Sequence, residues 1–336
     1  MPKHTIVVIP GDGIGPEVTG AAKRVLEAGG LSAEWVEVAA GARAIEQGFE
    51  SVLPQQTLDA IRAHRVCLKG PVTTPIGQGF ASVNVQLRKK LNLYAAVRPV
   101  RSMPGVKTRY ENVDLVVIRE NTEGLYSGIE NEVTPGVVTS LKVATETACT
   151  RIARYGFRYA TQRQRKRITV FHKANIMKMT DGLFLQCARR VQAEEYPSIG
   201  YEELIIDAAC MKLVQDPTRF DMLLCENLYG DVVSDLCAAL VGGLGVVPGA
   251  NIGDEAAVFE AVHGSAPDIA GQGIANPLAC IMSGVMMLNH LHEEGVGERI
   301  RNAYNKVLIE GQVLTRDLGG SAGTSEFTEA VLRRLA

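Results

Sequence analysis

Short apolar runs alternate along the chain with longer segments in which apolar residues recur every three to four positions. Such runs, closed by glycine, proline or charged residues, are typical of strands buried on both faces. We expect these strands at residues 5–9, 66–68, 113–118, 168–171, 204–206 and 222–225. The periodic segments predict one helix ending near residue 28 and others at 54–63, 82–91, 144–158, 178–193, 277–293, 297–310 and 325–335. Strands that alternate with helices predict an α/β fold on a largely parallel sheet.

Three stretches break this alternation. Residues 69–79 and 261–277 are rich in glycine and proline and have no periodicity. Loops of that kind at strand ends often carry function, although Asp268 within the second loop could be a simple turn former. Residues 127–143 alternate polar and apolar positions with few core signals, which predicts an arm that pairs with another chain.

The stretch at residues 226–245 combines an amphipathic pattern with two carboxylates. We expect its helix to open after Tyr229 and Gly230, with an apolar stripe formed by Val232, Val233, Leu236, Ala239 and Leu240. Asp231 and Asp235 are four positions apart and therefore share one face. Two oxygen ligands beside a strand end suit Mg²⁺ or Mn²⁺ when substrate and water complete the shell. The alternative is a solvated helix face, since an exposed like-charge pair costs only about 0.2–0.5 kcal/mol.

Composition narrows the class of protein. The 336 residues are 46% hydrophobic and 21% charged, with a net charge of −2, and a chain of this length usually forms two domains. No basic excess is available to neutralise phosphates, so we expect no nucleic-acid partner. The apolar runs fall short of the ~18 residues of a membrane helix, and the first residues enter a strand directly, so we expect neither a membrane span nor a signal peptide. Seven cysteines without CxxC spacing indicate reduced thiols and a cytoplasmic protein.

Several charged residues are placed where a ligand could meet them. Arg88, Arg98 and Arg119 lie at predicted element ends or on a polar helix face. A lone arginine is usually a surface residue, but three in such places suggest a polyanionic ligand, because a guanidinium grips a carboxylate bidentately. Lys173 follows a strand and is either a general acid and base or a solvated lysine. The first glycines do not match GxGxxG, because Pro16 takes the last position; a tight turn and a cofactor-contacting loop both stay open.

Eight motifs follow one another along nearly the whole chain: IPGDGIGPE at 9–17, KGPVTTP at 69–75, LRKKLNLYAAVRP at 87–99, IRENTEGLYSGIE at 118–130, HKANIMK at 172–178, ENLYGDVVSD at 226–235, HGSAPDIAGQGIANP at 263–277 and TRDLGG at 315–320. In content and order they closely resemble the β-decarboxylating dehydrogenases, the family of isocitrate, isopropylmalate and homoisocitrate dehydrogenases. The resemblance implies a two-domain α/β fold of the isopropylmalate/isocitrate dehydrogenase kind, not a Rossmann fold. Residues 1–95 and 245–336 would form the large domain and residues 96–244 the small one. It also implies a homodimer with shared active sites, which could assemble further into a higher homo-oligomer.

The resemblance further implies a role for each motif residue. Mg²⁺ or Mn²⁺ would be bound by Asp231 and Asp235 of one chain and Asp207 of the other. Catalysis would fall to Tyr126 and to Lys173 of the other chain. The substrate isocitrate would be bound by Ser82, Asn84, Arg88, Arg98, Arg119 and Asn175. The cofactor NAD would be bound by Thr74, His263, Gly264, Ser265, Ala266, Asp268, Ile269 and Asn276.

Two positions distinguish among members of the family. Ser82 and Asn84 favour isocitrate, because polar groups facing the isopropyl group of isopropylmalate would lose hydrogen bonds worth ~1–3 kcal/mol. Asp268 favours NAD, because a 2′-phosphate ~4 Å away would repel it by roughly 4 kcal/mol at an effective dielectric of ~20. The alternatives are isopropylmalate or homoisocitrate as substrate, or a regulatory subunit of a heteromeric isocitrate dehydrogenase. The presence of Tyr126, Lys173 and all three aspartates favours a catalytic chain.

Overall fold

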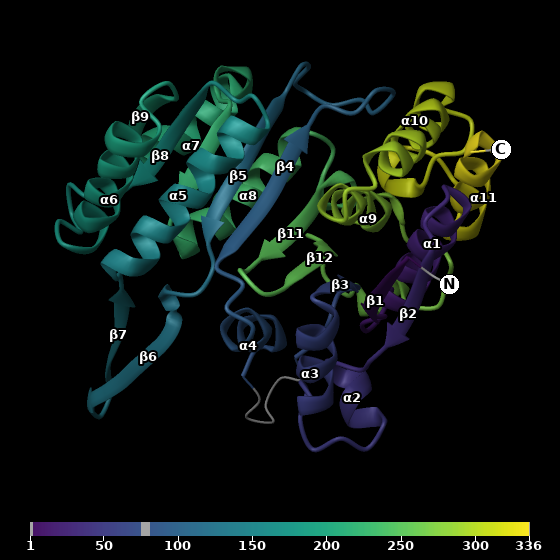
Figure 1. Ribbon diagram of the computed structural model, residues 1–336, viewed down its shortest axis with the longest axis horizontal. Helices are drawn as coiled ribbons and strands as arrows, with labels where there is room; N and C mark the ends of the chain where they lie inside the picture. The colour runs from purple at the N-terminus through teal and green to yellow at the C-terminus, as the bar shows by residue number, and fades with distance from the viewer. Residues whose placement is uncertain (1–2, 75–80, 336) are drawn as a thin grey trace. The chain divides into compact units, whose positions relative to one another are not determined.

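The computed structural model describes residues 3–74 and 81–335 (Figure 1). The predicted loop at 69–79 is therefore seen as far as Thr74, and its remainder lies outside the described residues. The chain divides into two compact units. Unit 1 comprises Met1–Leu93, Ser102–Arg109 and Val241–Ala336, and unit 2 comprises Tyr94–Arg101 and Tyr110–Leu240.

Unit 1 is built on five strands in the order β2-β1-β3-β12-β11. These are β2 (Ala33–Glu37), β1 (His4–Ile9), β3 (Val66–Lys69), β12 (Ala257–Ala261) and β11 (Pro248–Ile252). Neighbouring strands are parallel except β11 and β12, which pair antiparallel. The sheet is mixed because β11 and β12 are joined by a short turn, whereas parallel neighbours need a longer crossover.

Helices cover both faces of these strands. A first group packs together and lies over β3, β11 and β12: α1 (Gly15–Ala28), α9 (Leu278–His290), α10 (Glu294–Glu310) and α11 (Thr324–Leu335). The other face is covered by α3 (Gln55–His64) and α4 (Val83–Lys90), with the short α2 (Ala42–Glu46) nearby. Leu58 and Ile61 of α3, Leu87 of α4 and Val7 and Ile9 of β1 share one buried apolar cluster. Burial of their apolar surface holds α3 and α4 to the sheet.

Unit 2 has strands in the order β4-β5-β10-β8-β9. These are β4 (Ala95–Arg101), β5 (Asp114–Glu120), β10 (Met222–Cys225), β8 (Arg167–His172) and β9 (Gly200–Ile205). Only β4 and β5 pair antiparallel; the other neighbours are parallel. On one face lie α5 (Glu146–Gln162) and α6 (Thr180–Glu195), and on the other α7 (Ile206–Gln215) and α8 (Asn227–Leu240) (Figure 1). The strand β10 is buried throughout, as its uninterrupted apolar sequence predicts.

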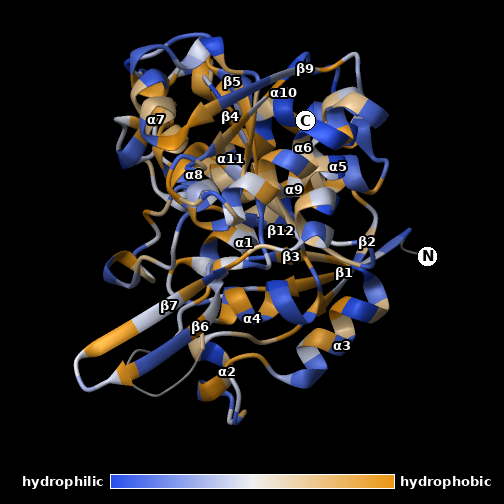
Figure 2. Ribbon diagram, turned by 90° about the vertical axis from the view of Figure 1, so that its left-hand side faces the viewer, coloured by the Kyte–Doolittle hydropathy of each residue, from blue (hydrophilic) through white to orange (hydrophobic). Residues whose placement is uncertain are grey.

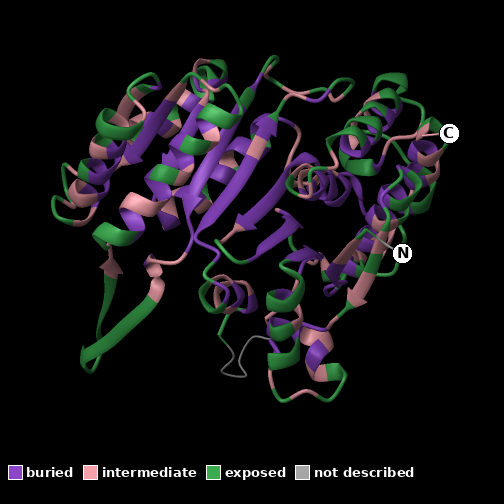
Figure 3. Cartoon of the chain, viewed as in Figure 1, coloured by how far each residue is buried: buried purple, intermediate pink, exposed green. Residues whose placement is uncertain are grey.

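The predicted arm is a two-stranded antiparallel hairpin of β6 (Gly124–Thr134) and β7 (Val137–Val143). Its outer part is exposed (Figure 3) although it carries apolar side chains (Figure 2). Among them are Val133, 67% exposed, and Val138, 66% exposed. An isolated hairpin is marginally stable in water, so an exposed apolar hairpin indicates a surface that another chain covers.

The structure differs from the predicted elements in several places. Helix α8 begins at Asn227, not after Gly230, because the Glu226 side chain accepts the Tyr229 N–H (2.8 Å) and caps the first turn. Its buried stripe contains Val233, Cys237 and Leu240, whereas Val232 is 58% exposed and Ala239 is exposed too.

Three further differences concern strands. Ile206 opens α7 and does not end a strand. Arg98 lies inside β4 and not at an element end. The pair β11 and β12 was not predicted, because its proline and glycine obscure the strand pattern.

Two general expectations have a counterpart in the structure. All seven cysteines are free thiols. Within residues 3–74 and 81–335, no helix combines the length and apolar character that crossing a bilayer requires.

Candidate active site

The predicted site residues of unit 2 lie at one edge of its sheet. Because β5, β10, β8 and β9 are parallel, their carboxyl ends meet at that edge. Arg119 lies at the end of β5, Lys173 directly follows β8 and Asp207 directly follows β9 in the first turn of α7. The turn after β10 opens α8, which carries Asp231 and Asp235. The order of the strands therefore gathers side chains that lie far apart in the sequence.

Arg119 is the most extensively bonded of these side chains. It is only 1% exposed, and its Nε and Nη2 both donate to Asn227 Oδ1, at 3.1 and 2.8 Å. Its Nη1 donates to Asp231 Oδ1. The Tyr126 hydroxyl donates to the other oxygen of Asp231, and the Arg119 guanidinium lies 5.0 Å from the centre of the Tyr126 ring. Charge-assisted bonds of this kind fix the guanidinium and the phenol in one orientation.

The fit of a divalent cation can be tested on the two aspartates. Partial desolvation, and then the nearby charge of Asp231, raise the pKa of Asp235, while Arg98 and Arg119 oppose this rise. Two carboxylates thus sit close enough to repel each other, which a cation between them would relieve. Each oxygen of Asp231 accepts one hydrogen bond and keeps a further lone pair for a metal. The donor set suits Mg²⁺ or Mn²⁺.

Within the described residues of one chain, no three of the His, Cys, Asp and Glu side chains form a metal-binding group. Asp207, the third predicted ligand, is instead paired with Lys173, whose Nζ lies 2.7 Å from Asp207 Oδ1. The hydrogen bond from Lys173 is the main reason that the pKa of Asp207 is lowered. The predicted residues of unit 2 therefore form two groups, one around Arg119 and Asp231 and one of Lys173 with Asp207.

Exposed apolar side chains flank both groups. Ile176, 69% exposed, and Met179, 87% exposed, follow Lys173, and the predicted substrate residue Asn175 is exposed between them and Lys173. Met211 lies one helical turn after Asp207, and Val232 adjoins Asp231. Apolar residues beside polar site residues are typical of a surface that another protein chain covers.

In unit 1, the predicted substrate residues lie on the first turns of α4. Ser82 caps the helix by accepting the Val85 N–H at 3.5 Å, and Thr74 Oγ1 accepts the Val83 N–H at 3.0 Å. Val83 is fully buried in the apolar core. The Asn84 Oδ1 atom is buried and has no hydrogen-bond partner in the described part of the chain. A buried amide without a partner is costly, so a polar ligand is expected there.

Arg88 is held by residues that the sequence did not single out. Its Nη2 lies 3.8 Å from Oε1 of Glu260, a buried acid on β12 that also pairs with Lys69 at the end of β3. Asn251 Nδ2 donates to the same Glu260 oxygen at 2.6 Å. A lysine closing the buried run 66–69 was the available signal, since a buried lysine is rarely without a partner.

The predicted cofactor residues follow β12 in one loop: His263, Gly264, Ser265, Ala266, Asp268 and Ile269. Burial lowers the pKa of His263, and its Nε2 has no partner among the described residues. An uncharged imidazole with a free ring nitrogen suits a planar, hydrogen-bonding group such as that of a dinucleotide. Asp268 is exposed in the short 3₁₀ turn Pro267–Ile269. The side chain of Asn276 donates to Asp317 (2.8 Å) and accepts from Leu278 N–H (2.9 Å), which leaves its main chain for the predicted adenine contact.

The glycine turn near the amino terminus has a structural role in unit 1 that its sequence left open. Asp12 accepts three backbone N–H groups: those of Thr73 (2.6 Å), Arg43 (2.8 Å) and Ala42 (3.1 Å). Gly13 has φ +59°, and a Cβ there would lie 2.0 Å from the Ser265 carbonyl oxygen. Thr73 Oγ1 and Ser265 Oγ are 2.7 Å apart. The turn therefore holds the Thr73 loop against the cofactor loop, and glycine is required where the backbones touch.

Comparison with known proteins identifies close relatives. The model of the isocitrate/isopropylmalate dehydrogenase family matches residues 5–331. The chain is 53% identical to the mitochondrial NAD isocitrate dehydrogenase catalytic subunit 5 of Arabidopsis thaliana, over 98% of this chain and 88% of that protein. It is 51% identical to the chloroplastic 3-isopropylmalate dehydrogenase of Solanum tuberosum, over 91% of this chain and 85% of that protein. The crystal structure of isocitrate dehydrogenase from Methylococcus capsulatus matches with a TM-score of 0.95 and 50% identity over 99% of each chain. The fold class predicted from the motifs is thereby confirmed.

Proposed function

The chain belongs to the isocitrate/isopropylmalate dehydrogenase family, and we propose that it is a catalytic NAD-dependent isocitrate dehydrogenase that forms 2-oxoglutarate and CO₂. The observation that carries the proposal is the group of Arg119, Tyr126, Asp231 and Asp235 at the sheet edge of unit 2. It combines a guanidinium for a substrate carboxylate, a phenol that can give a proton and a pair of acids that can hold a cation.

The metal and the coenzyme supply the chemistry that side chains lack. Mg²⁺ or Mn²⁺, held by Asp231 and Asp235 of one chain and Asp207 of another, would polarise the hydroxyl and carboxylate oxygens of isocitrate, and NAD⁺ would accept the hydride. The protein's own residues do the rest. Arg88, Arg98 and Arg119 bind and orient the carboxylates of the substrate. Lys173 takes the proton of the substrate hydroxyl, and Tyr126 gives a proton to the carbon that has lost CO₂.

A homodimer with shared sites follows from the same residues. Lys173 and Asp207 are paired with each other, and the apolar residues beside them, such as Ile176 and Met211, are exposed in the single chain. Docking a second copy there would bury this surface and bring the Lys173–Asp207 pair to the Asp231 group of the other subunit. The exposed hairpin of β6 and β7 offers a second contact. Larger homo-oligomers could assemble from such dimers.

Isocitrate is favoured over isopropylmalate by the start of α4. Ser82 and Asn84 present polar groups there, and Asn84 Oδ1 has no partner among the described residues. An isopropyl group would leave both unsatisfied, whereas a carboxylate could pair with the Ser82 hydroxyl and the Asn84 amide N–H. Because a 3-isopropylmalate dehydrogenase is about as similar to the chain as the isocitrate enzymes are, these two residues decide the substrate.

NAD is favoured over NADP by Asp268, whose exposed carboxylate stands in the cofactor loop. The test is a matrix of three substrates, isocitrate, 3-isopropylmalate and homoisocitrate, each with NAD⁺ or NADP⁺ and with Mg²⁺ or Mn²⁺. We expect turnover with isocitrate and NAD⁺ only, and Asp268→Lys should move the preference towards NADP⁺. Turnover of isopropylmalate at a comparable kcat/KM would refute the substrate, and an unchanged coenzyme preference would refute the role of Asp268.

A regulatory subunit of a heteromeric enzyme is the second candidate, because the Arabidopsis relative is named as one subunit among others. The chain keeps Tyr126, Lys173 and the three aspartates, which favours catalysis. Activity of the purified chain alone decides between the two. The free thiols suit a reducing compartment, so a cytoplasmic location stays part of the proposal. Cell fractionation tests it.

A further inference from the structure

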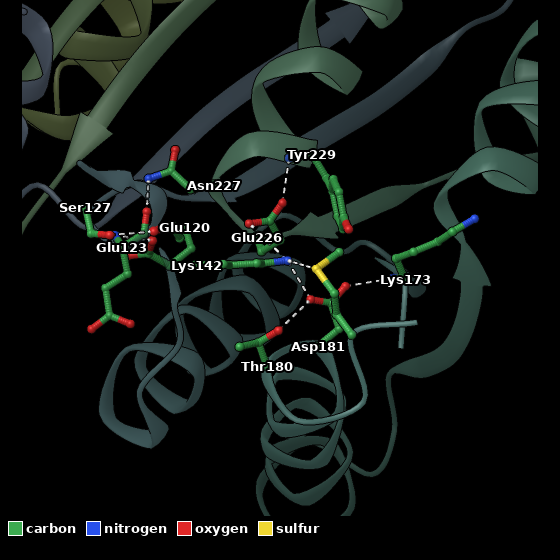
Figure 4. A network of polar contacts seen from close by, with 12 residues as sticks. Glu120, Glu123, Ser127, Lys142, Lys173, Thr180, Asp181, Glu226, Asn227 and Tyr229 are labelled. Atoms are coloured by element: carbon green, nitrogen blue, oxygen red, sulfur yellow. Dashed lines mark hydrogen bonds and ion pairs between the residues drawn. The ribbon is translucent and has the colours of Figure 1, made fainter. Parts of the chain in front are cut away.

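A buried polar network links Lys173 to the base of the β6–β7 hairpin (Figure 4). Its centre is Asp181, the second residue of α6, which is 2% exposed. Asp181 Oδ2 accepts the backbone N–H of Lys173 at 2.7 Å, and Oδ1 lies 2.5 Å from Lys142 Nζ. Figure 4 shows the Lys173 side chain running away from this carboxylate, so the contact holds the main chain and leaves the amine free to act elsewhere.

An aspartate in the first turn of a helix usually caps that helix or opposes its dipole. Here both carboxylate oxygens are turned to groups outside α6. The Lys173 N–H belongs to the turn after β8, and the Lys142 ammonium belongs to β7. The ordinary capping role therefore does not explain why this acid is buried.

Lys142 is enclosed as well, with 12% of its side chain exposed. Its ammonium lies 3.6 Å from Glu226 Oε2 and 4.6 Å from the centre of the Tyr229 ring. Glu226 caps α8, so one ammonium links the hairpin base, the start of α6 and the start of the helix that carries Asp231. A buried charge with two acids and an aromatic face around it has few other positions available.

Lys173 needs such an anchor because it stands on an irregular turn. The following residues up to Met179 are not part of a helix or strand, and Ile176 and Met179 are largely exposed. The tip of Lys173 meets Asp207 at 2.7 Å, but this bond does not fix the main chain from which the side chain starts. An error of about 1 Å in placing a catalytic group can cost on the order of 10²-fold in rate.

We propose that Asp181 is a positioning residue for Lys173, held in place by Lys142 from the base of the hairpin. The inference rests on the proposed role of Lys173 in proton transfer. It makes the hairpin part of the catalytic apparatus, since movement of β7 reaches Lys173 through only two contacts, from Lys142 to Asp181 and from Asp181 to the Lys173 N–H.

The test compares Asp181→Asn and Lys142→Met with a matched control in the full-length enzyme. The amide keeps the shape of Asp181 but turns N–H donors towards a second donor, and methionine keeps the stem of Lys142 without its charge. Glu195→Gln is the control, because it removes the exposed ion pair with Arg154 at the other end of the same helix. We expect kcat to fall about 10- to 100-fold in Asp181→Asn, with KM for isocitrate and NAD⁺ within about threefold, and Glu195→Gln to match wild type.

A double variant separates positioning from general damage. If Asp181 acts through Lys173, adding Asp181→Asn to Lys173→Met should cause no further loss of rate, because the group being positioned is already absent. An equal loss in that background, or wild-type kcat in both Asp181→Asn and Lys142→Met, would overturn the inference. Lys142→Met decides the matter by the same criteria if Asp181→Asn does not fold. A Lys173→Met enzyme of normal rate would instead refute the proposed role of Lys173 itself.

Discussion

Replacing Gly230 by alanine should disable substrate binding without touching any group that reacts. Gly230 lies in the first turns of α8, where the Arg119 side chain crosses the helix backbone. A Cβ at this position would lie 2.4 Å from Arg119 Cγ, 2.6 Å from its Cβ and 3.0 Å from its Cδ. Ordinary van der Waals contact begins at 3.4 Å, so the arginine stem must move by 3.4 − 2.4 = 1.0 Å.

The stem cannot move this far freely. The atoms that clash are the first carbons of the side chain, close to the buried strand β5, and Arg119 is 1% exposed. Its guanidinium is held at 2.8 and 3.1 Å by Asn227 and is bonded to Asp231. We expect the overpacking to cost about 1–3 kcal/mol of unfolding free energy. A displacement of about 1 Å at the guanidinium should lower kcat/KM for isocitrate by about 10- to 100-fold.

Steady-state kinetics and thermal unfolding measure the two effects. KM for isocitrate should rise while KM for NAD⁺ stays near its wild-type value, because Arg119 lies in unit 2 and the cofactor loop in unit 1. Gly20→Ala is the control: Gly20 is also helical, in α1, but nothing lies within 4 Å of its added Cβ. Alanine there should be neutral or should stabilise by up to about 1 kcal/mol. A Gly230→Ala enzyme with wild-type kcat/KM would show that Arg119 is not set by its contact with the helix.

Three further predictions follow from other parts of the molecule. Asp12→Asn should raise KM for NAD⁺ more than KM for isocitrate, because an amide cannot accept all three N–H groups that hold the Thr73 loop; equal changes in both constants would contradict this. Burial raises the pKa of Glu226, so the folded chain binds a proton that the unfolded chain releases, and this part of the stability, complete below pH 4.5, is lost as pH rises through the folded pKa. Glu226→Gln should therefore gain unfolding free energy relative to wild type across that window, which urea titrations at several pH values would detect; parallel pH curves would exclude it. Val138→Glu should weaken the self-association seen by light scattering, since it puts a charge on the exposed apolar hairpin, and an unchanged dimer would show that the hairpin does not pair.

The sequence predicted those elements whose signal is local. The run 222–225 is apolar because β10 is buried on both faces, and its bounds match the prediction. Asp231 and Asp235 share a helix face for reasons of helical geometry alone. Ser82 marks the start of α4 because a hydroxyl before a helix accepts a free N–H. None of these inferences needed knowledge of distant residues.

The sequence was less informative where a residue's partner is remote or absent. Val232 was assigned to the buried stripe of α8, because an apolar residue that another chain would cover cannot be told by pattern from one that the core covers. Glu260, Asp181 and Asp12 gave no signal, since a buried acid is recognisable only once its partners are in place. Their positions depend on tertiary structure, so propensity and periodicity cannot reveal them.

The division of the site between two chains leads to a prediction that mixing can test. Each proposed site takes Asp231 from one subunit and Lys173 from the other. Lys173→Met and Asp231→Asn should each be nearly inactive as homodimers, because every site then lacks one essential group. In a mixed dimer both lesions fall on the same site, and the second site receives a normal Asp231 and a normal Lys173. Random exchange of equal amounts makes half of the dimers mixed, so about one quarter of wild-type activity should return. If each site were complete within one chain, every site in the mixture would still carry one lesion and no activity would return. Recovery after joint unfolding and refolding, compared with each variant refolded alone, therefore decides whether the Lys173–Asp207 pair serves its own chain or its neighbour.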